Sequence, residues 1–535
     1  MTLNPRSLLG VQPQKARVLL GQERQRFRGE MAAQKAGEVW ASFDGRIGTV
    51  LTGGGARGAY QVGGLLAFQD AGLPTHIITA TSVGSINAAS YAAQSDGLVG
   101  NAESLAESWF NLTPFDVGVE WTRYIWMLFG LITASIGFEN LMGYVLAAHG
   151  FSFSLHDPAH TWIALGVGGT AVLLSYDRLS YIAYVARNLL RDGSWKPDGH
   201  KTAISLIANL IVWSCLVLAV SSLHPHVLLA NTHFHPRLIA LVGGALGILV
   251  LLRYVFSGPL STLLHRMLRL PLRSGLFANF ERSRLLRQRI SVENLRASPV
   301  RVVFTATDLG AGVARFFSNQ SPDQLAADPR TDARFIDEEI TKTDDLIGAV
   351  VASSALPIIY EPIAFDGRVY SDGGIIANQP IRPAIRLGAD VLFLVMMNQP
   401  VGLRGEVKTF IDVGQRAFDI LMLQNMMTDL KILTGVNALC ERAAARLSLH
   451  PEEIEIDSGM RRYRYIKTFA IQPGAPLAGT RLDFTAKTTG PAILQGYLDA
   501  CIQIENFLAY ARQAKFGGPK RVLRFVHESD SFETG

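Results

Sequence analysis

Ser82 lies in a short stretch, ITATSVGSINA at residues 77–87, that passes from strand-like apolar residues to small, helix-forming ones. A sharp strand-to-helix turn of the form G-x-S-x-G can present a serine as a nucleophile. Ala80 stands where the first glycine is usual, and Gly84 keeps the second. Because alanine adds only one methyl group, we expect the tight turn to survive. Ser82 is therefore a candidate nucleophile, and a serine in an ordinary small-residue turn is the alternative.

A glycine-rich stretch at residues 51–60, LTGGGARGAY, follows an apolar run and precedes a helical one. Gly53, Gly55 and Gly58 fit the spacing G-x-G-x-x-G, which is typical of dinucleotide-binding folds. Those folds also need an acidic residue about twenty positions later to hold the ribose. No Asp or Glu occurs between positions 70 and 96, so the sequence does not favour a dinucleotide site.

The same glycines can serve a different purpose. Consecutive glycines can turn several backbone N–H groups toward one point at a helix N-terminus, where negative charge is favoured. Such donors stabilise the oxyanion that forms during acyl transfer. We expect Gly53, Gly54 and Gly55 to form an oxyanion hole, with Arg57 as a positive charge beside it.

Asp372 is the third candidate, in VYSDGGIIANQP at residues 369–380. It follows a short β-branched and aromatic run and precedes Gly373 and Gly374, which is where a loop would hold a carboxylate at the end of a strand. A carboxylate within hydrogen-bond reach of a serine hydroxyl can remove its proton during attack. Asp372 is therefore a candidate general base, and an aspartate that only serves a turn is the alternative.

The stretches around these residues predict an α/β fold. Continuous apolar runs predict strands of a mostly parallel sheet that helices cover on both faces. A helix is expected at residues 379–388. The predicted strands lie within GRIGTVLTGGG, HIITATS, SPVRVVFTATDLGAG, GRVYSDGG and GADVLFLVMM.

The composition indicates that part of the chain lies in lipid. The 535 residues are 48% apolar and only 18% charged, with a mean hydropathy of +0.20. Soluble proteins have about 25% charged residues. The net charge of +5 comes without any recognised nucleic-acid motif, so we expect no nucleic-acid partner and instead an anionic lipid surface.

The apolar residues concentrate between positions 124 and 256. Residues 203–223 are uncharged and long enough to cross a bilayer, and residues 238–256 would return the chain. Two weaker candidates begin at Tyr124 and at position 162, so two or four spans are predicted. Buried helices of a large soluble protein are the alternative.

The distribution of basic residues predicts an orientation. The expected outer loops, 149–160 and 224–237, contain no Lys or Arg except Arg237, whereas nine arginines lie between positions 266 and 301. Because basic residues remain on the cytoplasmic side, a multi-pass membrane protein with a cytoplasmic catalytic part is predicted.

Neither a metal nor a cofactor is predicted. The three cysteines are widely spaced and lack C-x-x-C spacing, which does not favour a disulfide framework or a zinc site. Seven histidines fall in the expected outer loops, so a metal site there is conceivable, but carboxylates and thiols that would complete it are sparse. These histidines are His149, His156, His160, His224, His226, His233 and His235.

Five blocks, in this order, resemble the patatin-like phospholipases: GGGARGAY, TSVGS, ATDLGAG, VVASSALPIIYEPI and SDGGIIANQP. The resemblance covers roughly residues 46–118 and 300–510. It implies a three-layer α/β/α fold and a Ser-Asp dyad without a catalytic histidine. On this resemblance Ser82 is the nucleophile, Asp372 the base, Gly54 and Gly55 the oxyanion donors, and Arg57 a supporting cation. Ala80 and the long apolar insertion depart from the family pattern.

The predicted function is that of a membrane-bound lipid acyl hydrolase that forms an acyl-enzyme. A catalytically silent scaffold, for which Ala80 is the hint, and a transporter, for which Glu139 is the hint, are alternatives. The sequence does not indicate an oligomeric state. The expected parts are a basic extension (1–45), a first core part (46–118), a transmembrane insertion (119–260), an arginine-rich connector (261–299), a second core part (300–510) and a tail (511–535).

Overall fold

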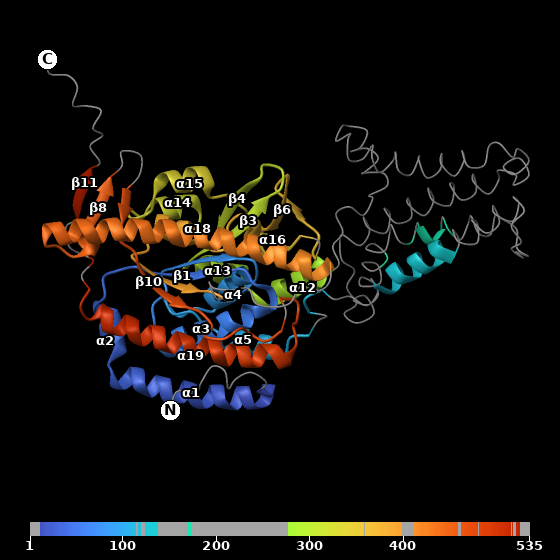
Figure 1. Ribbon diagram of the computed structural model, residues 1–535, viewed down its shortest axis with the longest axis horizontal. Helices are drawn as coiled ribbons and strands as arrows, with labels where there is room; N and C mark the ends of the chain where they lie inside the picture. Colours follow the sequence, from blue (N-terminus) through green and yellow to red (C-terminus); the bar gives the residue numbers. More distant parts are fainter. Residues whose placement is uncertain are drawn as a thin grey trace, which may run out of the picture. The chain divides into compact units, whose positions relative to one another are not determined.

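Two structural units make up the chain, one formed by Met1–Gly118 with Glu281–Gly535 and one by Val119–Phe280. The molecule is seen here as a computed structural model (Figure 1). The structure describes residues 11–113, 116–118, 124–136, 166, 168–170, 172, 179, 277–357, 359–397, 410–457, 462–479, 481–514, 516 and 520–524.

An eight-stranded sheet forms the centre of the first unit, in the order β10-β7-β1-β2-β3-β6-β5, with β4 also paired to β3. The strands β10, β7, β1, β2 and β3 run parallel, whereas β4, β5 and β6 pair antiparallel with their neighbours. The predicted mostly parallel sheet is confirmed. The bounds are β1 (Ile47–Leu51), β2 (Ile77–Thr81), β3 (Arg301–Asp308), β4 (Val313–Ser318), β5 (Ile363–Phe365), β6 (Arg368–Asp372), β7 (Val391–Val395) and β10 (Lys467–Ile471).

Helices surround this sheet, and a second, three-stranded sheet has the order β11-β8-β9. Its strands are β8 (Ile454–Asp457), β9 (Arg462–Arg464) and β11 (Arg521–Arg524). The helices are α1 (Pro13–Ala33), α2 (Ala36–Ser42), η2 (Gly55–Gly58), α3 (Ala59–Asp70), α4 (Val83–Ala92), α5 (Glu103–Phe110), α12 (Asn279–Arg289), α13 (Val292–Ala297), α14 (Pro322–Ala326), α15 (Ala333–Glu339), α16 (Leu346–Ser353), η3 (Gly373–Ile375), α17 (Ile381–Arg386), α18 (Phe410–Leu447), η4 (Pro451–Glu453) and α19 (Ala486–Ala511).

Strand β3 is longer than its neighbours and pairs with two strands along one edge. Its pairing with β2 ends at Thr81 opposite Thr305, and its pairing with β6 begins at Asp372 opposite Ala306. Strand β4 occupies the other edge over residues 303–308. Since β6 runs antiparallel to β3, the carboxyl ends of β2 and β6 meet head to head.

The side chains of β7 show the three-layer arrangement. Phe393 contacts Phe68 of α3 and Phe507 of α19, with ring centroids 5.0 and 5.3 Å away. Leu392 and Leu394, on the other face of the strand, join a cluster with α17 and α18. Figure 1 shows α18 along one side of the sheet, and α3 and α19 along the other. The sheet is therefore buried on both faces.

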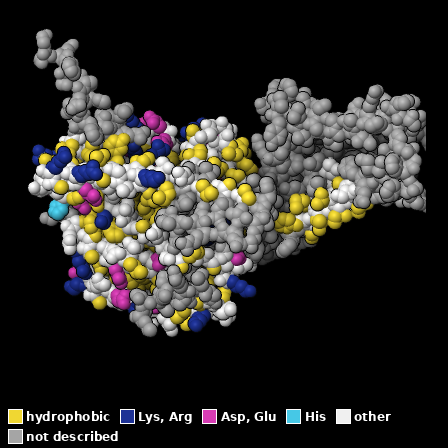
Figure 2. All heavy atoms as spheres, viewed as in Figure 1, with side chains coloured by type: hydrophobic (Ala, Val, Ile, Leu, Met, Phe, Trp, Pro, Cys, Tyr) yellow, Lys and Arg dark blue, Asp and Glu magenta, His cyan; other side chains and the backbone are white. Residues whose placement is uncertain are grey.

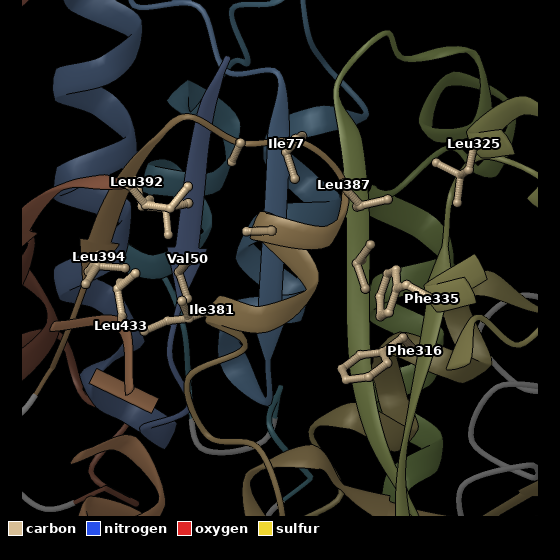
Figure 3. Packing of buried hydrophobic residues seen from close by; sticks show 14 of the residues in the cluster. Val50, Ile77, Phe316, Leu325, Phe335, Ile381, Leu387, Leu392, Leu394 and Leu433 are labelled. Atoms are coloured by element: carbon tan, nitrogen blue, oxygen red, sulfur yellow. The ribbon is translucent and has the colours of Figure 1, made fainter. Parts of the chain in front are cut away.

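The cluster on the α17–α18 face holds the strands together (Figure 3). Val50 of β1, Ile77 of β2 and Leu394 of β7 pack with Ile381 of α17 and Leu433 of α18. All five side chains are buried. Full burial of a side chain of this size contributes about 1.5–3 kcal/mol, so the cluster fixes the sheet whose strand ends carry the candidate residues.

The N-terminal segment predicted as a basic extension is packed against the core from residue 13 onward. Phe27 of α1 is buried and meets Tyr497 of α19 edge to face, with ring centroids 6.1 Å apart. Arg24 and Arg28 both bind Asp70, at 2.7 and 2.6 Å. Sequence alone missed this packing because the four buried residues are spread along a 21-residue helix among polar and charged ones.

Part of the arginine-rich connector is also bound to the protein. Arg282 is only 5% exposed and donates to the carbonyl oxygen of Ser354 at 2.6 Å. Arg287 pairs with Asp345 at 2.9 Å. Because Arg282 is buried, it cannot face a lipid surface, and an anionic lipid partner for the segment stays a prediction.

The predicted C-terminal tail contains a strand. Residues 521–524 form β11, which pairs parallel with β8. The sequence Arg-Val-Leu-Arg suits an edge strand, since Val522 is β-branched and favours extended backbone. The predicted tail, 511–535, thus includes four residues in a regular strand.

In the second unit, a helix is described at residues 124–136. It contains no charged residue, and Figure 2 shows mostly hydrophobic side chains along it. Exposed apolar residues on it are Ile125, Leu128, Phe129, Leu131, Ile132 and Ile136. No helix among the described residues has both the length and the apolar character needed to cross a bilayer. The predicted spans 203–223 and 238–256, the seven loop histidines and Glu139 lie outside the described residues.

Helices α3 and α19 cross with almost no space between their backbones. A Cβ atom added to Gly63 would lie 1.9 Å from the carbonyl oxygen of Ile493, and one added to Gly496 would lie 1.9 Å from that of Tyr60. Each helix thus supplies a glycine where the other helix approaches, and no larger residue fits.

We expect Gly63→Ala to lower the free energy of unfolding by about 3 kcal/mol or more, because the added methyl group overlaps backbone that cannot move aside. Gly29→Ala, on the exposed side of α1 with no atom within 4 Å, should instead raise it by up to about 1 kcal/mol. Urea unfolding followed by circular dichroism measures both. Equal midpoints for Gly63→Ala and the unmodified protein would contradict the close crossing.

Candidate active site

Ser82 and Asp372, which are 290 positions apart in the sequence, are joined by a hydrogen bond. The Oγ of Ser82 donates to Oδ2 of Asp372 at 2.6 Å. The second carboxylate oxygen, Oδ1, accepts the N–H of Gly374 at 2.7 Å, and the Asp372 side chain is almost fully buried. This contact follows from the sheet, because Ser82 directly succeeds β2 and Asp372 ends β6, where the two strands meet.

The backbone at Ser82 has the sharp turn predicted from the sequence. Its φ is 57° and its ψ is −130°, a conformation that non-glycine residues rarely adopt, and α4 begins at the next residue. A Cβ atom on Gly84 would lie 2.6 Å from the carbonyl oxygen of Leu51, so glycine is required there. The turn thus presents the hydroxyl at the end of the strand.

Ala80 does not disturb this turn. It is fully buried within β2 and is not among the described residues with positive φ. The position therefore has no conformational need for glycine. Since alanine fits there, the departure from G-x-S-x-G no longer favours a catalytically silent protein.

Ser353 of α16 fixes the turn and was not singled out by the sequence analysis. Its Oγ donates to the carbonyl oxygen of Thr305 at 2.5 Å and accepts the N–H of Ser82 at 3.0 Å. It also contacts the Oγ of Ser85 at 2.8 Å, and it is fully buried. Ser353 lies in the block VVASSALPIIYEPI, which contributes to the family resemblance. Nothing in the sequence distinguished this serine from Ser354 beside it.

The glycine loop lies beside the dyad. A Cβ atom on Gly53 would lie 3.0 Å from the Cβ of Ser82. Among the described residues, no acceptor is found for the N–H groups of Gly54 and Gly55. The amides on either side are occupied, that of Gly53 by the carbonyl oxygen of Asn378 at 3.3 Å and that of Ala56 by the carbonyl oxygen of Arg481 at 2.7 Å.

Gly55 is held in a conformation that suits only glycine. Its φ is +59°, and an added Cβ atom would lie 2.2 Å from the carbonyl oxygen of Arg481. The conformation begins η2, where the first N–H groups of a helix have no partner within the helix. The N–H groups of Gly54 and Gly55 therefore remain available to an anion.

A pocket contains these groups together. Ser82, Asp372 and residues 53–55 line it, with Arg282, Arg481, Tyr360, Asn378 and Ser354. The remaining wall is apolar and consists of Val83, Ile86, Val117, Leu356, Leu482 and Phe484. Neither His76 nor His450, the histidines that the structure describes, lines it.

The sequence model of the family described as patatin-like phospholipase matches residues 49–385, which is more than half of the chain. The chain belongs to the patatin-like phospholipase family. The matched range includes Ser82, Asp372 and the glycine loop.

Individual relatives match over shorter stretches. A patatin-like phospholipase domain-containing protein of Caenorhabditis elegans is 49% identical over 65 residues, 12% of this chain and 5% of that protein. Lysophospholipase nte1 of Aspergillus oryzae is 38% identical over 97 residues, 16% of this chain and 6% of that protein. The alignments thus span about a twentieth of these longer relatives. Among solved structures, VipD from Legionella pneumophila matches with a TM-score of 0.28 and 14% identity, over 86% of this chain and 67% of that one.

Two arginines line the pocket, and the predicted supporting cation, Arg57, is not one of them. Arg57 lies in η2 and is not part of the pocket wall, whereas Arg282 and Arg481 are. The guanidinium of Arg282 lies over the ring of Tyr360, 3.8 Å from its centroid. It also donates to the carbonyl oxygens of Val351 and Ser354, at the carboxyl end of α16.

Burial raises the pKa of Asp372 to about 6. The hydrogen bonds from Ser82 and Gly374 and the positive charges of Arg282 and Arg481 oppose the increase. The carboxylate is therefore mostly ionised at pH 7, yet it is a stronger base than an exposed aspartate. A base whose pKa lies near the working pH is what proton transfer from a serine hydroxyl requires.

We expect kcat/KM to rise with pH through about 6 and then level off, because only ionised Asp372 can accept the proton. Arg282→Gln should move this midpoint to higher pH, since it removes a positive charge that favours the carboxylate, and Arg282→Lys should restore it. A pH profile with a soluble ester measures the midpoint. An unmoved midpoint in a folded Arg282→Gln variant would show that Arg282 does not tune the carboxylate; Arg446→Gln, an exposed change on α18, is the control.

Proposed function

We propose that this chain hydrolyses carboxylic esters of lipids through a serine nucleophile and an acyl-enzyme. The observation that carries the proposal is the 2.6 Å hydrogen bond between Ser82 and the buried carboxylate of Asp372. A patatin-like phospholipase is expected to act on lipid esters, and the pocket holds a nucleophile, a base and unoccupied backbone donors. The apolar wall that begins at Val83 and Ile86 suits an acyl chain.

In the first half-reaction, Oγ of Ser82 forms a bond to the ester carbonyl carbon while its proton passes to Asp372. The carbonyl oxygen becomes an oxyanion, which the N–H groups of Gly54 and Gly55 stabilise by about 3–4 kcal/mol per well-placed donor. The bond to the alcohol oxygen then breaks, and this oxygen takes the proton from Asp372. The acyl group remains on Ser82 and the carboxylate is regenerated.

In the second half-reaction, water replaces the alcohol. Asp372 accepts a proton from the water as its oxygen attacks the acyl carbon, and the same donors hold the second oxyanion. The bond to Oγ breaks, Ser82 recovers its proton from Asp372, and a fatty acid leaves. A single carboxylate serves both steps because it returns to its ionised state after each one.

Ser82→Ala and Asp372→Asn should each lower kcat on a lipid ester by at least about 10³-fold, since the nucleophile or its base is lost. A fluorophosphonate probe should label the unmodified protein and fail to label Ser82→Ala. Ser42→Ala, at the exposed end of α2, should behave like the unmodified protein. Equal hydrolysis by Ser82→Ala would reject the assignment, and an unlabelled, inactive parent protein would favour the silent scaffold.

We also propose that residues 119–260 hold the protein on a membrane, with the catalytic part on the cytoplasmic side. The uncharged stretch 203–223 supports this, as do the stretch 238–256, in which Arg253 is the single charged residue, and the exposed apolar side chains on the helix at 124–136. Lipid esters reside in the bilayer, so a membrane-held enzyme reaches its substrate without extracting it into water.

Replacing residues 119–260 by a flexible linker should release the protein from membranes, because the apolar segments are removed, while hydrolysis of a short-chain soluble ester persists. Flotation with vesicles measures the first property and a spectrophotometric ester assay the second. Undiminished flotation of the shortened, active protein would show that another part of the chain binds the membrane.

A further inference from the structure

Charged side chains collect at the edge of the sheet where the parallel strands begin, at the opposite end from Ser82. Arg46, His76 and Arg301 stand at the starts of β1, β2 and β3, and Asp390 directly precedes β7. We refer to the charged members as the amino-edge cluster. They are five basic side chains, Arg46, Arg301, Arg330, Arg464 and Lys520, and two acidic ones, Asp328 and Asp390.

The first carboxylate of the cluster has two cations at ion-pair distance. Arg46 and Arg301 both approach Oδ2 of Asp328, at 2.6 and 2.5 Å. The backbone N–H of Arg330 donates to its other oxygen at 3.0 Å. Asp328 is buried, and its pKa falls to about 2 because these hydrogen bonds outweigh its burial. This part of the cluster is a closed ion-pair site.

The second carboxylate, Asp390, has three cations nearby, but none of them lies within the distance of a short ion pair. The charged nitrogens of Arg330, Arg464 and Lys520 lie 3.5, 4.0 and 3.9 Å from Asp390. The close hydrogen bond to Asp390 comes instead from the backbone N–H of Arg46, at 2.9 Å. Three cations therefore converge on one carboxylate at distances longer than charge-assisted hydrogen bonds, which are about 2.7–2.9 Å.

One N–H group of the Arg464 side chain lacks a hydrogen-bond acceptor among the described residues. Its Nη2 donates to the carbonyl oxygens of Ile385 and Ala389, at 3.2 and 2.9 Å. Its Nε is buried and has no hydrogen-bond acceptor among the described residues. A buried N–H without an acceptor is costly, so an additional acceptor would be favourable here.

Burial and nearby positive charges lower the pKa of two groups in this region. Burial and the charges of Arg46, Arg330 and Arg301 lower the pKa of His76 to about 4, with Asp390 acting in the opposite direction. Burial also lowers the pKa of Lys520; Arg464 and Arg330 act in the same direction, whereas Asp390 and Glu455 oppose them. An anion placed among these cations would therefore meet a favourable potential.

We propose that the amino-edge cluster binds a phosphate-type oxyanion, held by Arg330, Arg464 and Lys520. Such an anion offers several acceptor oxygens and more than one negative charge, which matches two guanidinium groups and an ammonium better than a monovalent ion does. The three side chains are 44%, 20% and 25% exposed, so the site is open to solvent while being partly desolvated.

This site is separate from the catalytic pocket. His76 precedes β2 and Ser82 follows it, so a five-residue strand, roughly 15–20 Å long, lies between the two ends. None of the five cations lines the pocket. The proposal consequently does not depend on the catalytic assignment.

The test is calorimetric titration of the full chain with inorganic phosphate, at constant ionic strength maintained with chloride. We expect saturable binding at one site and a melting temperature that rises with phosphate relative to chloride. The Arg330→Gln/Lys520→Gln double variant should bind at least 10-fold more weakly, and the exposed change Arg446→Gln should have no effect. Lys520→Gln alone, expected to weaken binding several-fold, covers the case in which the double variant does not fold.

Vesicles distinguish a soluble anion from a lipid headgroup. Capture of the unmodified protein, but not of the variants, by phosphatidylcholine vesicles that contain phosphatidate, with free phosphate as a competitor, would assign a headgroup. Saturable phosphate binding without such capture would assign a soluble anion. Absence of both, or phosphate binding that is undiminished in the variants, would overturn the proposal.

Discussion

The active-site geometry depends on strand β3 pairing with two strands along one edge. Strand β2 occupies the first part of this edge as far as Thr305, and β6 occupies the remainder from Ala306. Backbone hydrogen bonds fix this register, so the positions of Ser82 and Asp372 follow from the sheet rather than from flexible loops. Ser353 strengthens the arrangement because it joins the N–H of Ser82 to the carbonyl oxygen of Thr305 on the same strand. Such rigidity keeps the hydroxyl of Ser82 and the carboxylate of Asp372 within hydrogen-bond distance.

Charge is handled differently at the two ends of the sheet. In the pocket, one carboxylate is buried with little direct ionic contact, and its pKa is correspondingly high. Arg282 is anchored on the carboxyl end of α16 and on the Tyr360 ring, which hold its charge in a fixed place. At the amino edge, Asp328 has short ion pairs and a low pKa. The pKa of Asp372 is thus higher than that of Asp328, because Asp328 accepts more hydrogen bonds from charged donors.

Much of the fold and of the site could be predicted because both leave local patterns. Uninterrupted apolar runs identified β1, β2 and β7, and the glycines at positions 53–55 and 84 marked backbone that approaches its neighbours closely. The pairing of Ser82 with Asp372 came from several blocks in a known order and not from spacing. The direction of β6 could not be predicted, since an apolar run carries no information about whether a strand runs parallel or antiparallel.

What the sequence missed depends on contacts between distant segments. Arg282 is one of nine arginines between positions 266 and 301, a segment whose composition predicted contact with lipid headgroups. The sequence does not show which of them is buried, because this depends on the position of α16. Arg481 lies in no distinctive pattern and reaches the pocket through its position beside the glycine loop. The packing of α1 was hidden for a similar reason, because four buried residues along twenty-one make a weak stripe among charged ones.

The inserted unit divides the sheet between β2 and β3, and this has a consequence for biosynthesis. Ser82 emerges from the ribosome 290 residues before Asp372, and at about 5–20 residues per second that interval lasts roughly 15 to 60 s. During this time the nascent chain carries the hydroxyl without its proton acceptor. The hydrogen bond between Ser82 and Asp372 can therefore form only after the whole inserted unit, Val119–Phe280, has been translated.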